Sequence, residues 1–108
     1  MIELSDQIFN EFVNSSEKVV IVDFWAPWCA PCLRLSPILQ ELSTEFAETV
    51  VFAKMNTDVE VKIAKEFDIM SIPSLLIFHN GEFQGKMNAS GSASALRERI
   101  TETVNIFK

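Results

Sequence analysis

The sequence predicts an α/β protein in which helices cover both faces of a mixed β-sheet. Strand-like and helix-like segments alternate along most of the 108 residues, which is the pattern of parallel crossover connections. Val19–Trp25 is apolar on both alternations, as expected of a strand that is buried on both faces. Asn80-Gly81 is a strong signal for a two-residue hairpin turn, which adds an antiparallel strand. We expect four to five strands and four helices in three layers.

The first half of the chain supplies two helices and one long buried strand. Ser5 is the candidate N-cap of a short first helix, which is indicated by apolar residues at helical spacing. These residues are Ile8, Phe9, Phe12 and Val13. After Val19–Trp25, a second helix with one apolar stripe runs from Ala30 to about Phe46. A short strand at Ile2–Leu4 would be the fifth strand of the sheet.

The second half supplies a strand, a helix, a hairpin and a final helix. Val50–Met55 is strand-like, and Thr57-Asp-Val-Glu60 resembles a capping box that opens the third helix. The inner face of that helix carries Ile63, Ala64 and Phe67. Ser74–Phe78 and Glu82–Met87 flank the hairpin turn as its two strands. An apolar stripe marks the fourth helix, with Ser92 or Ser94 as its cap. The stripe consists of Leu96, Ile100, Val104 and Phe107.

The charge of the chain excludes several classes of partner. Fifteen acidic and nine basic side chains give a net charge of −6, which disfavours binding to nucleic-acid phosphates and to anionic membranes. No apolar run approaches the roughly 18 residues of a membrane span. The N-terminal residues lack the basic and apolar regions of a signal peptide, so we expect a cytoplasmic protein.

Two cysteines and one histidine leave little room for a metal site. A closed structural zinc site takes four protein ligands, and His79 is far from the cysteines in sequence, so we expect no metal. Cys29 and Cys32 are separated by two residues and close only a small loop, which is unlike a disulfide scaffold. Half of a zinc site, a pair of buried core thiols and a subunit-bridging iron–sulfur site remain as alternatives to redox exchange.

The Cys-Ala-Pro-Cys segment lies where the buried strand ends and the second helix begins. Cys29 falls at or just before the first helical turn, where unpaired N–H groups and the helix dipole favour thiolate over thiol. Thiolate is the nucleophile of disulfide exchange, so Cys29 is the attacking residue. Cys32 lies on the same helix face at i+3 and can resolve a mixed disulfide. Pro31 suits the first helical turn because the missing N–H costs little there.

Two charged residues in predicted strands are candidates for proton handling. Asp23 interrupts an apolar strand, and desolvation there should raise the pKa of its carboxyl group. It is either a proton acceptor for Cys32 or a tolerated polar residue at a sheet edge. Lys54 could pair with Asp23 if the two strands are neighbours, or it could face solvent. Pro73 stands at the start of a strand, where a trans Ile72–Pro73 bond is the ordinary expectation.

Taken together, these residues resemble the thioredoxin family over essentially the whole chain. Val22–Cys32 is similar to the active-site segment of that family. Further landmarks match in order and at the family's spacings: Pro37, Lys54, Ile72-Pro73 and Asn80-Gly81. A single Cys-x-x-Cys is a weak signal, whereas the ordered set is highly specific. The resemblance implies the thioredoxin fold, with residues 1–108 as a single thioredoxin domain.

The resemblance also implies a role for each site residue. Cys29 attacks the disulfide of a target protein and Cys32 releases it, so the chain carries a redox-active Cys29–Cys32 disulfide and no bound cofactor. Asp23, with Lys54, handles the proton of Cys32. Pro73 is cis and completes the catalytic set beside the dithiol.

The resemblance places an apolar docking surface around an exposed Cys29 sulfur. The residues expected to contact the target are Trp28, Ala30, Pro31, Ile72 and Ala89, together with Pro73. The backbone of Ile72 pairs with the substrate strand.

Three departures from the family pattern touch recognition or redox potential and leave the chemistry intact. Ala30 stands where the family usually has Gly, and Leu33 stands where it usually has Lys or Arg. Arg34 follows, which moves a positive charge around the helix. Ala89 holds the place of a usual Gly near the docking surface, with Gly91 two residues later. These changes point to an atypical member with a Cys-Ala-Pro-Cys active site.

The sequence therefore predicts a thiol–disulfide oxidoreductase that acts as a protein-disulfide reductase. The expected partners are disulfide-containing target proteins and a thioredoxin reductase, NADPH-dependent by default, as electron donor. An oxidase or isomerase of an oxidising compartment is disfavoured by the N-terminal sequence and by Asp23. A thioredoxin-fold binding module, acting mainly by protein–protein interaction, is disfavoured because both cysteines and Asp23 are present.

Overall fold

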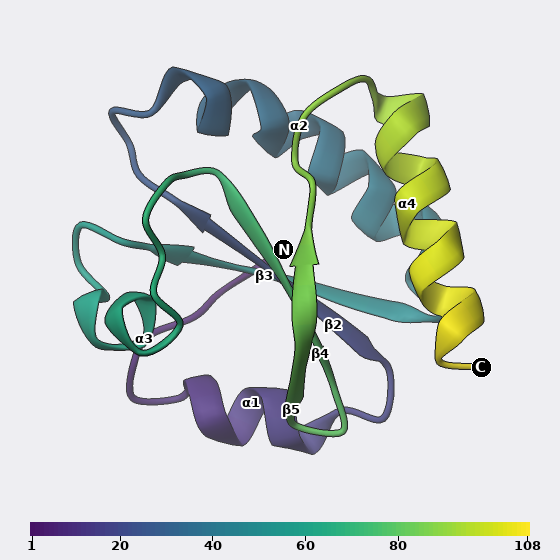
Figure 1. Ribbon diagram of the computed structural model, residues 1–108, viewed down its shortest axis with the longest axis horizontal. Coiled ribbons are helices and arrows are strands. Elements are labelled where there is room, and N and C mark those ends of the chain that lie inside the picture. The colour runs from purple at the N-terminus through teal and green to yellow at the C-terminus, as the bar shows by residue number, and fades with distance from the viewer.

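A five-stranded mixed sheet forms the middle layer of the computed structural model, which describes residues 1–108 (Figure 1). The strands lie in the order β1 (Ile2–Glu3), β3 (Val50–Asn56), β2 (Val19–Trp25), β4 (Ser74–His79) and β5 (Glu82–Met87). β1 and β2 run parallel to β3, whereas β4 runs antiparallel to both β2 and β5. The predicted fold class, with its parallel crossovers and terminal hairpin, is confirmed.

Four helices cover the two faces of this sheet. They are α1 (Phe9–Ser15), α2 (Ala30–Glu45), α3 (Val61–Glu66) and α4 (Ala93–Ile106). In Figure 1, α2 and α4 lie together on one side of the sheet, and α1 and α3 lie on the other. None of the four combines the length and apolar character needed to cross a membrane.

Alternation along β2 divides the core into two clusters of eleven buried residues each. Val20, Val22 and Phe24 pack toward α1 and α3, while Val19 and Ile21 pack toward α2 and α4. Fully burying an aliphatic or aromatic side chain contributes about 1.5–3 kcal/mol, so both faces of this strand stabilise the fold. The same alternation directs the next odd position of β2, where a carboxylate stands, toward α2.

The hairpin between β4 and β5 has the turn that the sequence predicts. Asn80 and Gly81 both adopt positive φ, at 52° and 82°. A type I′ turn requires this conformation at both central positions, and Gly adopts it without steric cost. A Cβ atom at position 81 would also collide with the side chain of Asn14 on α1. The turn therefore requires Gly both for its backbone conformation and for its packing.

The helix caps agree with the sequence at one end of the chain and differ at the other. Ser92 caps α4 by accepting a hydrogen bond from Ala95 N at 3.2 Å, as predicted. The predicted Ser5 cap is wrong, because α1 begins after Ile8 and has no side-chain cap. Ser5 instead accepts a bond from Ile8 N through its backbone carbonyl at 3.3 Å.

Helix α3 is capped from a distant part of the chain. The capping box predicted at Thr57–Glu60 is wrong, since no side chain of this segment caps the helix. Instead, the Asp6 carboxylate accepts bonds from Lys62 N at 3.0 Å and Ile63 N at 2.9 Å. These N–H groups are the ones that a helix leaves unpaired at its start. The loop after β1 thereby holds α3 in place.

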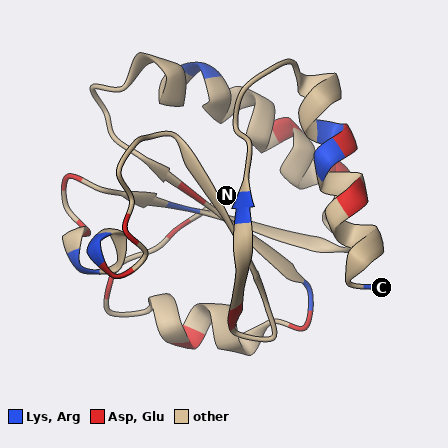
Figure 2. Ribbon diagram, in the orientation of Figure 1, with Lys and Arg blue, Asp and Glu red and all other residues tan.

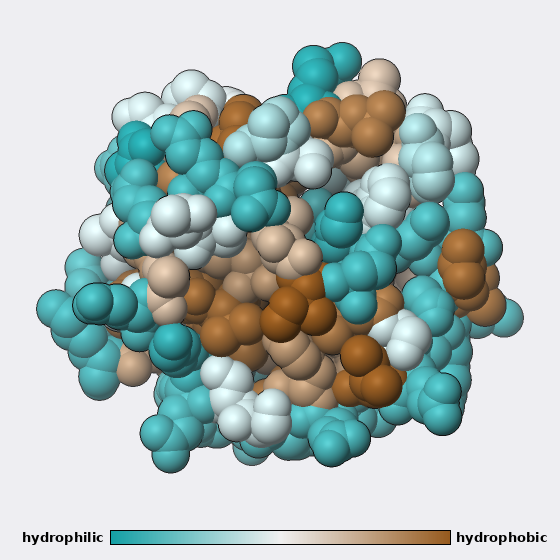
Figure 3. All heavy atoms as spheres, turned by 180° about the vertical axis from the view of Figure 1, so that it is seen from behind, coloured by the Kyte–Doolittle hydropathy of each residue, from teal (hydrophilic) through white to brown (hydrophobic).

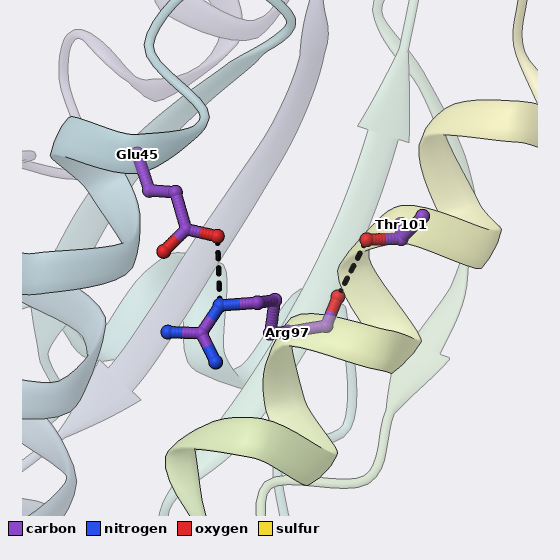
Figure 4. A network of polar contacts seen from close by, with 3 residues as sticks. All are labelled: Glu45, Arg97 and Thr101. Carbon is purple, nitrogen blue, oxygen red and sulfur yellow. Dashed lines mark hydrogen bonds and ion pairs between the residues drawn. The ribbon is translucent and has the colours of Figure 1, made fainter.

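An exposed ion pair joins the two helices on the other face. Arg97 Nε of α4 donates to Glu45 Oε2 of α2 at 2.7 Å, and Thr101 Oγ1 donates to the Arg97 carbonyl at 2.8 Å (Figure 4). Both charged side chains are substantially exposed, so solvent screens the pair and limits its contribution to stability.

Charge is spread over the molecule, whereas hydrophobic surface is more localised. Lys and Arg are scattered over helices, strands and loops in the view of Figure 2, with acidic residues between them. Seen from behind, hydrophobic atoms gather near the centre of the molecule and hydrophilic residues surround them (Figure 3). Basic residues are therefore not gathered on one element of the fold.

Candidate active site

The dithiol lies at the junction between β2 and α2. Cys29 is the N-cap of α2, and its Sγ accepts a hydrogen bond from Cys32 N at 3.2 Å. The two cysteines form a disulfide with their Cα atoms 5.2 Å apart. The predicted place of Cys29 at the start of the helix is confirmed. In the reduced protein this N–H group and the positive end of the helix would stabilise a thiolate at Cys29.

The disulfide is more buried than the sequence suggests. Cys29 is 4% exposed and Cys32 is 1% exposed. The expectation of an exposed Cys29 sulfur is therefore wrong for the oxidised chain. Ala26 and both cysteines form a small buried cluster, against which Trp25 and Ile72 pack. Little of the disulfide is therefore open to an approaching thiolate.

The peptide bond between Ile72 and Pro73 is cis, as the resemblance implies. It precedes β4, which is paired with β2 in the antiparallel sense. The Ile72 carbonyl oxygen lies 3.8 Å from Cys29 Sγ. The segment before β4 therefore lies beside the attacking sulfur.

Asp23 is the buried carboxylate on the α2 side of β2. It is 3% exposed, and its Oδ1 atom has no hydrogen-bond partner. Burial raises the pKa of Asp23 from 3.8 to about 7, Lys54 opposes this rise, and Glu3 adds to it. The predicted direction of the shift is confirmed, and the carboxyl group can gain or lose a proton near neutrality.

Lys54 lies opposite Asp23 but does not pair with it. The two residues are register partners in the parallel β2–β3 ladder, so the expected neighbourhood is confirmed. Lys54 Nζ instead lies 4.8 Å from the centre of the Trp25 ring, which is a cation–π geometry. The direct ion pair considered from sequence is absent from the structure.

Glu3 is the site residue that sequence reasoning missed. Its Oε2 atom accepts a hydrogen bond from Trp25 Nε1 at 3.3 Å, and Glu3 is the register partner of Lys54 on the other side of β3. The signal was present in the short strand expected at the N-terminus. Parallel pairing of that strand with β3 would have placed Glu3 beside Lys54.

Two grooves flank the disulfide and divide the predicted docking residues between them. A groove of about 390 Å³ on the α3 side is lined by Trp28 and Ile72, and one of about 520 Å³ on the other side by Pro31, Pro73 and Ala89. Ala30 lines neither groove and is exposed on the first turn of α2.

Trp28 and Arg34 make the two grooves chemically different, because one is lined by an exposed indole and the other by a positive charge. Trp28 is 69% exposed, and its Nε1 donates to Asp58 Oδ1 at 3.0 Å, which fixes the indole over the smaller groove. Arg34 is the one charged residue that lines the larger groove, and it forms no ion pair. The two grooves therefore present different surfaces on the two sides of the disulfide.

The described side chains include no group of three or more His, Cys, Asp or Glu residues that could hold a metal ion. The chemistry that this arrangement supports directly is exchange between the dithiol and an external disulfide. The structure brings together Cys29, the predicted nucleophile, and Cys32, its predicted resolving partner, and Asp23 is the buried titratable group on the same side of the sheet.

Comparison with known proteins agrees with the geometry. The family model described as "Thioredoxin" matches residues 1–102. The thioredoxin of Buchnera aphidicola subsp. Acyrthosiphon pisum is 41% identical over 105 residues, which is 97% of each chain. The thioredoxin of Mycobacterium tuberculosis is 41% identical over 98 residues, 90% of this chain and 84% of that protein. A bifunctional thioredoxin reductase/thioredoxin of Mycobacterium leprae is 39% identical over 98 residues, 90% of this chain and 21% of that protein.

Proposed function

The chain belongs to the thioredoxin family and is a protein-disulfide reductase, and we propose that Cys29 begins each cycle by attacking a target disulfide. The observation that carries this proposal is the hydrogen bond from Cys32 N to Cys29 Sγ at the start of α2. In the reduced protein, this N–H group and the helix dipole would favour the thiolate form of Cys29. Cys32 lies inside the helix and is less open to a partner.

The cycle conserves atoms and electrons in two exchange steps. Cys29 thiolate attacks one sulfur of the target disulfide, forms a mixed disulfide and releases the other target sulfur as a thiolate. Cys32 then loses its proton and attacks Cys29 Sγ, which releases the second target sulfur. The target gains two electrons and two protons, of which one comes from the Cys32 thiol and the other from solvent, which received the Cys29 proton when the thiolate formed. The chain is left with the Cys29–Cys32 disulfide seen in the structure.

Asp23 is the proposed acceptor of the Cys32 proton. A pKa of about 7 allows its carboxylate to take a proton near neutrality and to give it up after the exchange. Its unpartnered Oδ1 atom leaves an acceptor free for this step. Lys54 tunes this acceptor electrostatically from the neighbouring strand.

The two grooves are the proposed docking surface for target proteins. An extended target segment would lie across the disulfide beside Ile72 and Pro73, with its backbone pairing to Ile72. Trp28 would contact the segment on the α3 side, and Pro31 and Ala89 would contact it on the α4 side. Ala30 would meet it above the disulfide, where its exposed methyl group limits how closely the target backbone approaches.

We further propose a thioredoxin reductase, NADPH-dependent, as the electron donor. The name of the Mycobacterium leprae relative joins a reductase and a thioredoxin in one protein, which supports this class of partner. Residues 1–108 would act as a single thioredoxin domain in the cytoplasm, where glutathione and reductases keep thiols reduced.

The reduction potential of the Cys29–Cys32 pair, measured together with a disulfide-reduction assay, tests this function. We expect a low, reducing potential and loss of activity in Cys29→Ser. A high, oxidising potential would favour an oxidase or isomerase. Background activity of the wild-type chain, combined with tight binding to a partner, would reject the reductase and favour a binding module.

A further inference from the structure

We propose that Glu3 is a positioning residue for Asp23: it holds the Trp25 indole and keeps the Lys54 ammonium from forming an ion pair with that carboxylate. The inference rests on the proposed role of Asp23 as proton acceptor and adds a residue of β1 to the reaction. It depends on four residues from three adjacent strands, Glu3, Asp23, Trp25 and Lys54.

The strand register places Glu3, Lys54 and Asp23 in one row across the sheet, and Trp25 follows Asp23 two residues later on β2. Lys54 of β3 is the partner of Glu3 in β1 and of Asp23 in β2. Adjacent strands are spaced by roughly 4.8 Å, so Lys54 stands between two carboxylates at similar backbone distances. Its ammonium can approach either neighbour, and the local contacts decide which one it approaches.

The contacts of Trp25 place the ammonium over the indole ring that Glu3 holds. The indole Nε1 donates to Glu3 Oε2 at 3.3 Å, and Lys54 Nζ lies 4.8 Å from the centre of the same ring. Glu3 thus fixes the ring, and the ring face together with the negative charge attracts the ammonium. Asp23 Oδ1 is left buried and without a hydrogen-bond partner.

No other charged group faces Asp23 from the elements packed around it. β4 and β5 bring apolar side chains to this side of the sheet, as do α2 and α4. The buried residues concerned are Leu75, Met87, Leu35, Leu39, Leu96 and Ile100. The thiols of Cys29 and Cys32 do not titrate while they form the disulfide. In the oxidised chain, burial raises the pKa of Asp23 most, and Glu3 and Lys54 are the charged neighbours that adjust it.

The consequence concerns the strength of Asp23 as a base. Without the charge of Glu3, Lys54 is free to turn toward Asp23 and stabilise its carboxylate form. A carboxylate in such a pair is a weaker base and accepts the Cys32 proton less readily. Glu3 therefore keeps Asp23 poised to exchange a proton near neutral pH, although it is exposed and touches neither sulfur.

A titration of the Asp23 carboxyl carbon by NMR in the oxidised chain tests this inference. Glu3→Gln keeps an acceptor for Trp25 Nε1 and removes the charge, so the Asp23 pKa should fall by about half a unit or more. Because Glu3 is exposed, the shift should shrink at 1 M salt, where the Debye length is about 3 Å. The matched control is Glu11→Gln on α1, an exposed residue across the sheet, which should leave the pKa unchanged.

The pH profile of mixed-disulfide resolution gives a second readout. In Glu3→Gln, the rise of this rate with pH should move to lower pH together with the Asp23 pKa. An unchanged or raised Asp23 pKa in Glu3→Gln would overturn the inference. Failure of the proposed function looks different: Asp23→Asn would then turn over like wild type, while Glu3→Gln would still shift the Asp23 pKa.

Discussion

Lys54 stands directly opposite Asp23 in the parallel register of β2 and β3, yet its ammonium lies over the Trp25 ring and forms no ion pair with that carboxylate. A paired Asp23 would remain ionised at every physiological pH. The unpaired, buried group has a pKa of about 7. This arrangement costs stability and leaves a buried titratable group of the kind that the proposed proton transfer from Cys32 requires.

The cost of burying Asp23 predicts how stability varies with pH. The folded-state pKa is raised from 3.8 to about 7, so the native state binds more protons than the unfolded state between these values. Stability therefore falls as pH rises from about 4 to 7. Asp23→Asn removes this loss and should be more stable than wild type by about 1–3 kcal/mol at pH 8. The measurement is urea denaturation of the oxidised chains at pH 8 and pH 4.

The extra stability of Asp23→Asn over wild type should shrink toward pH 4, because the wild-type carboxyl group is protonated there in the native state. Glu66→Gln, at an exposed position of α3, serves as the control. An equal stability difference between wild type and Asp23→Asn at both pH values would contradict the raised pKa.

The same substitution predicts a loss of turnover. Asp23→Asn retains the shape of the side chain and cannot accept a proton, so resolution of the mixed disulfide should slow by about tenfold or more. The wild-type rate should rise as pH passes through about 7 and Asp23 ionises, and the variant should lack this rise. Single-turnover kinetics between pH 6 and pH 8 measure both effects. Identical pH profiles would remove Asp23 from the mechanism.

The larger groove predicts that a substitution within it weakens the docking of protein substrates and leaves the disulfide exchange itself intact. Ala89→Phe should fill part of the groove of about 520 Å³ beside Pro73. We expect kcat/KM for a protein disulfide to fall by about tenfold, which corresponds to roughly 1.4 kcal/mol of lost docking energy. The rate with a small aromatic disulfide should change little, because such a substrate needs only the sulfur. Thr101→Phe, on the exposed face of α4, is the control. Equal losses of rate with the protein disulfide and the small disulfide in Ala89→Phe would exclude the groove as a docking surface.

The cap on α3 predicts a stability effect far from the helix in sequence. Asp6→Ala removes the acceptor for Lys62 N and Ile63 N and should lower the free energy of unfolding by about 1–2 kcal/mol. Urea denaturation at pH 7 measures it, with Glu11→Ala on α1 as the exposed acidic control. A loss no larger than that of the control would show that solvent caps the helix equally well.

Sequence periodicity was sufficient to predict the layers of the fold. The two-sided burial of β2, the Asn80-Gly81 turn and the Ser92 cap all depend on residues close together in the chain, and each is confirmed. The cap on α3 was not accessible in this way. It comes from Asp6, more than 50 residues upstream, and only the parallel pairing of β1 with β3 brings it to the helix.

In the site, too, the features that depend on nearby residues could be predicted, and those that depend on strand pairing could not. The place of Cys29 at the start of α2 and the raised pKa of Asp23 follow from local sequence and burial. The position of Lys54 does not, because three neighbours compete for one ammonium and their distances depend on strand register. Glu3 was missed for the same reason: the short N-terminal strand was expected, but the contact of Glu3 with Trp25 depends on the pairing of that strand with β3.

The most direct test of the account is trapping of the mixed disulfide. Cys32→Ser leaves Cys29 as the only thiol and removes the resolving step, so a disulfide-bonded target should remain attached through Cys29. Mass spectrometry of the non-reduced product identifies the linked cysteine. We expect a stable adduct with Cys32→Ser and none with Cys29→Ser. Equal or greater trapping by Cys29→Ser, through Cys32, would contradict the assignment of Cys29 as the attacking residue.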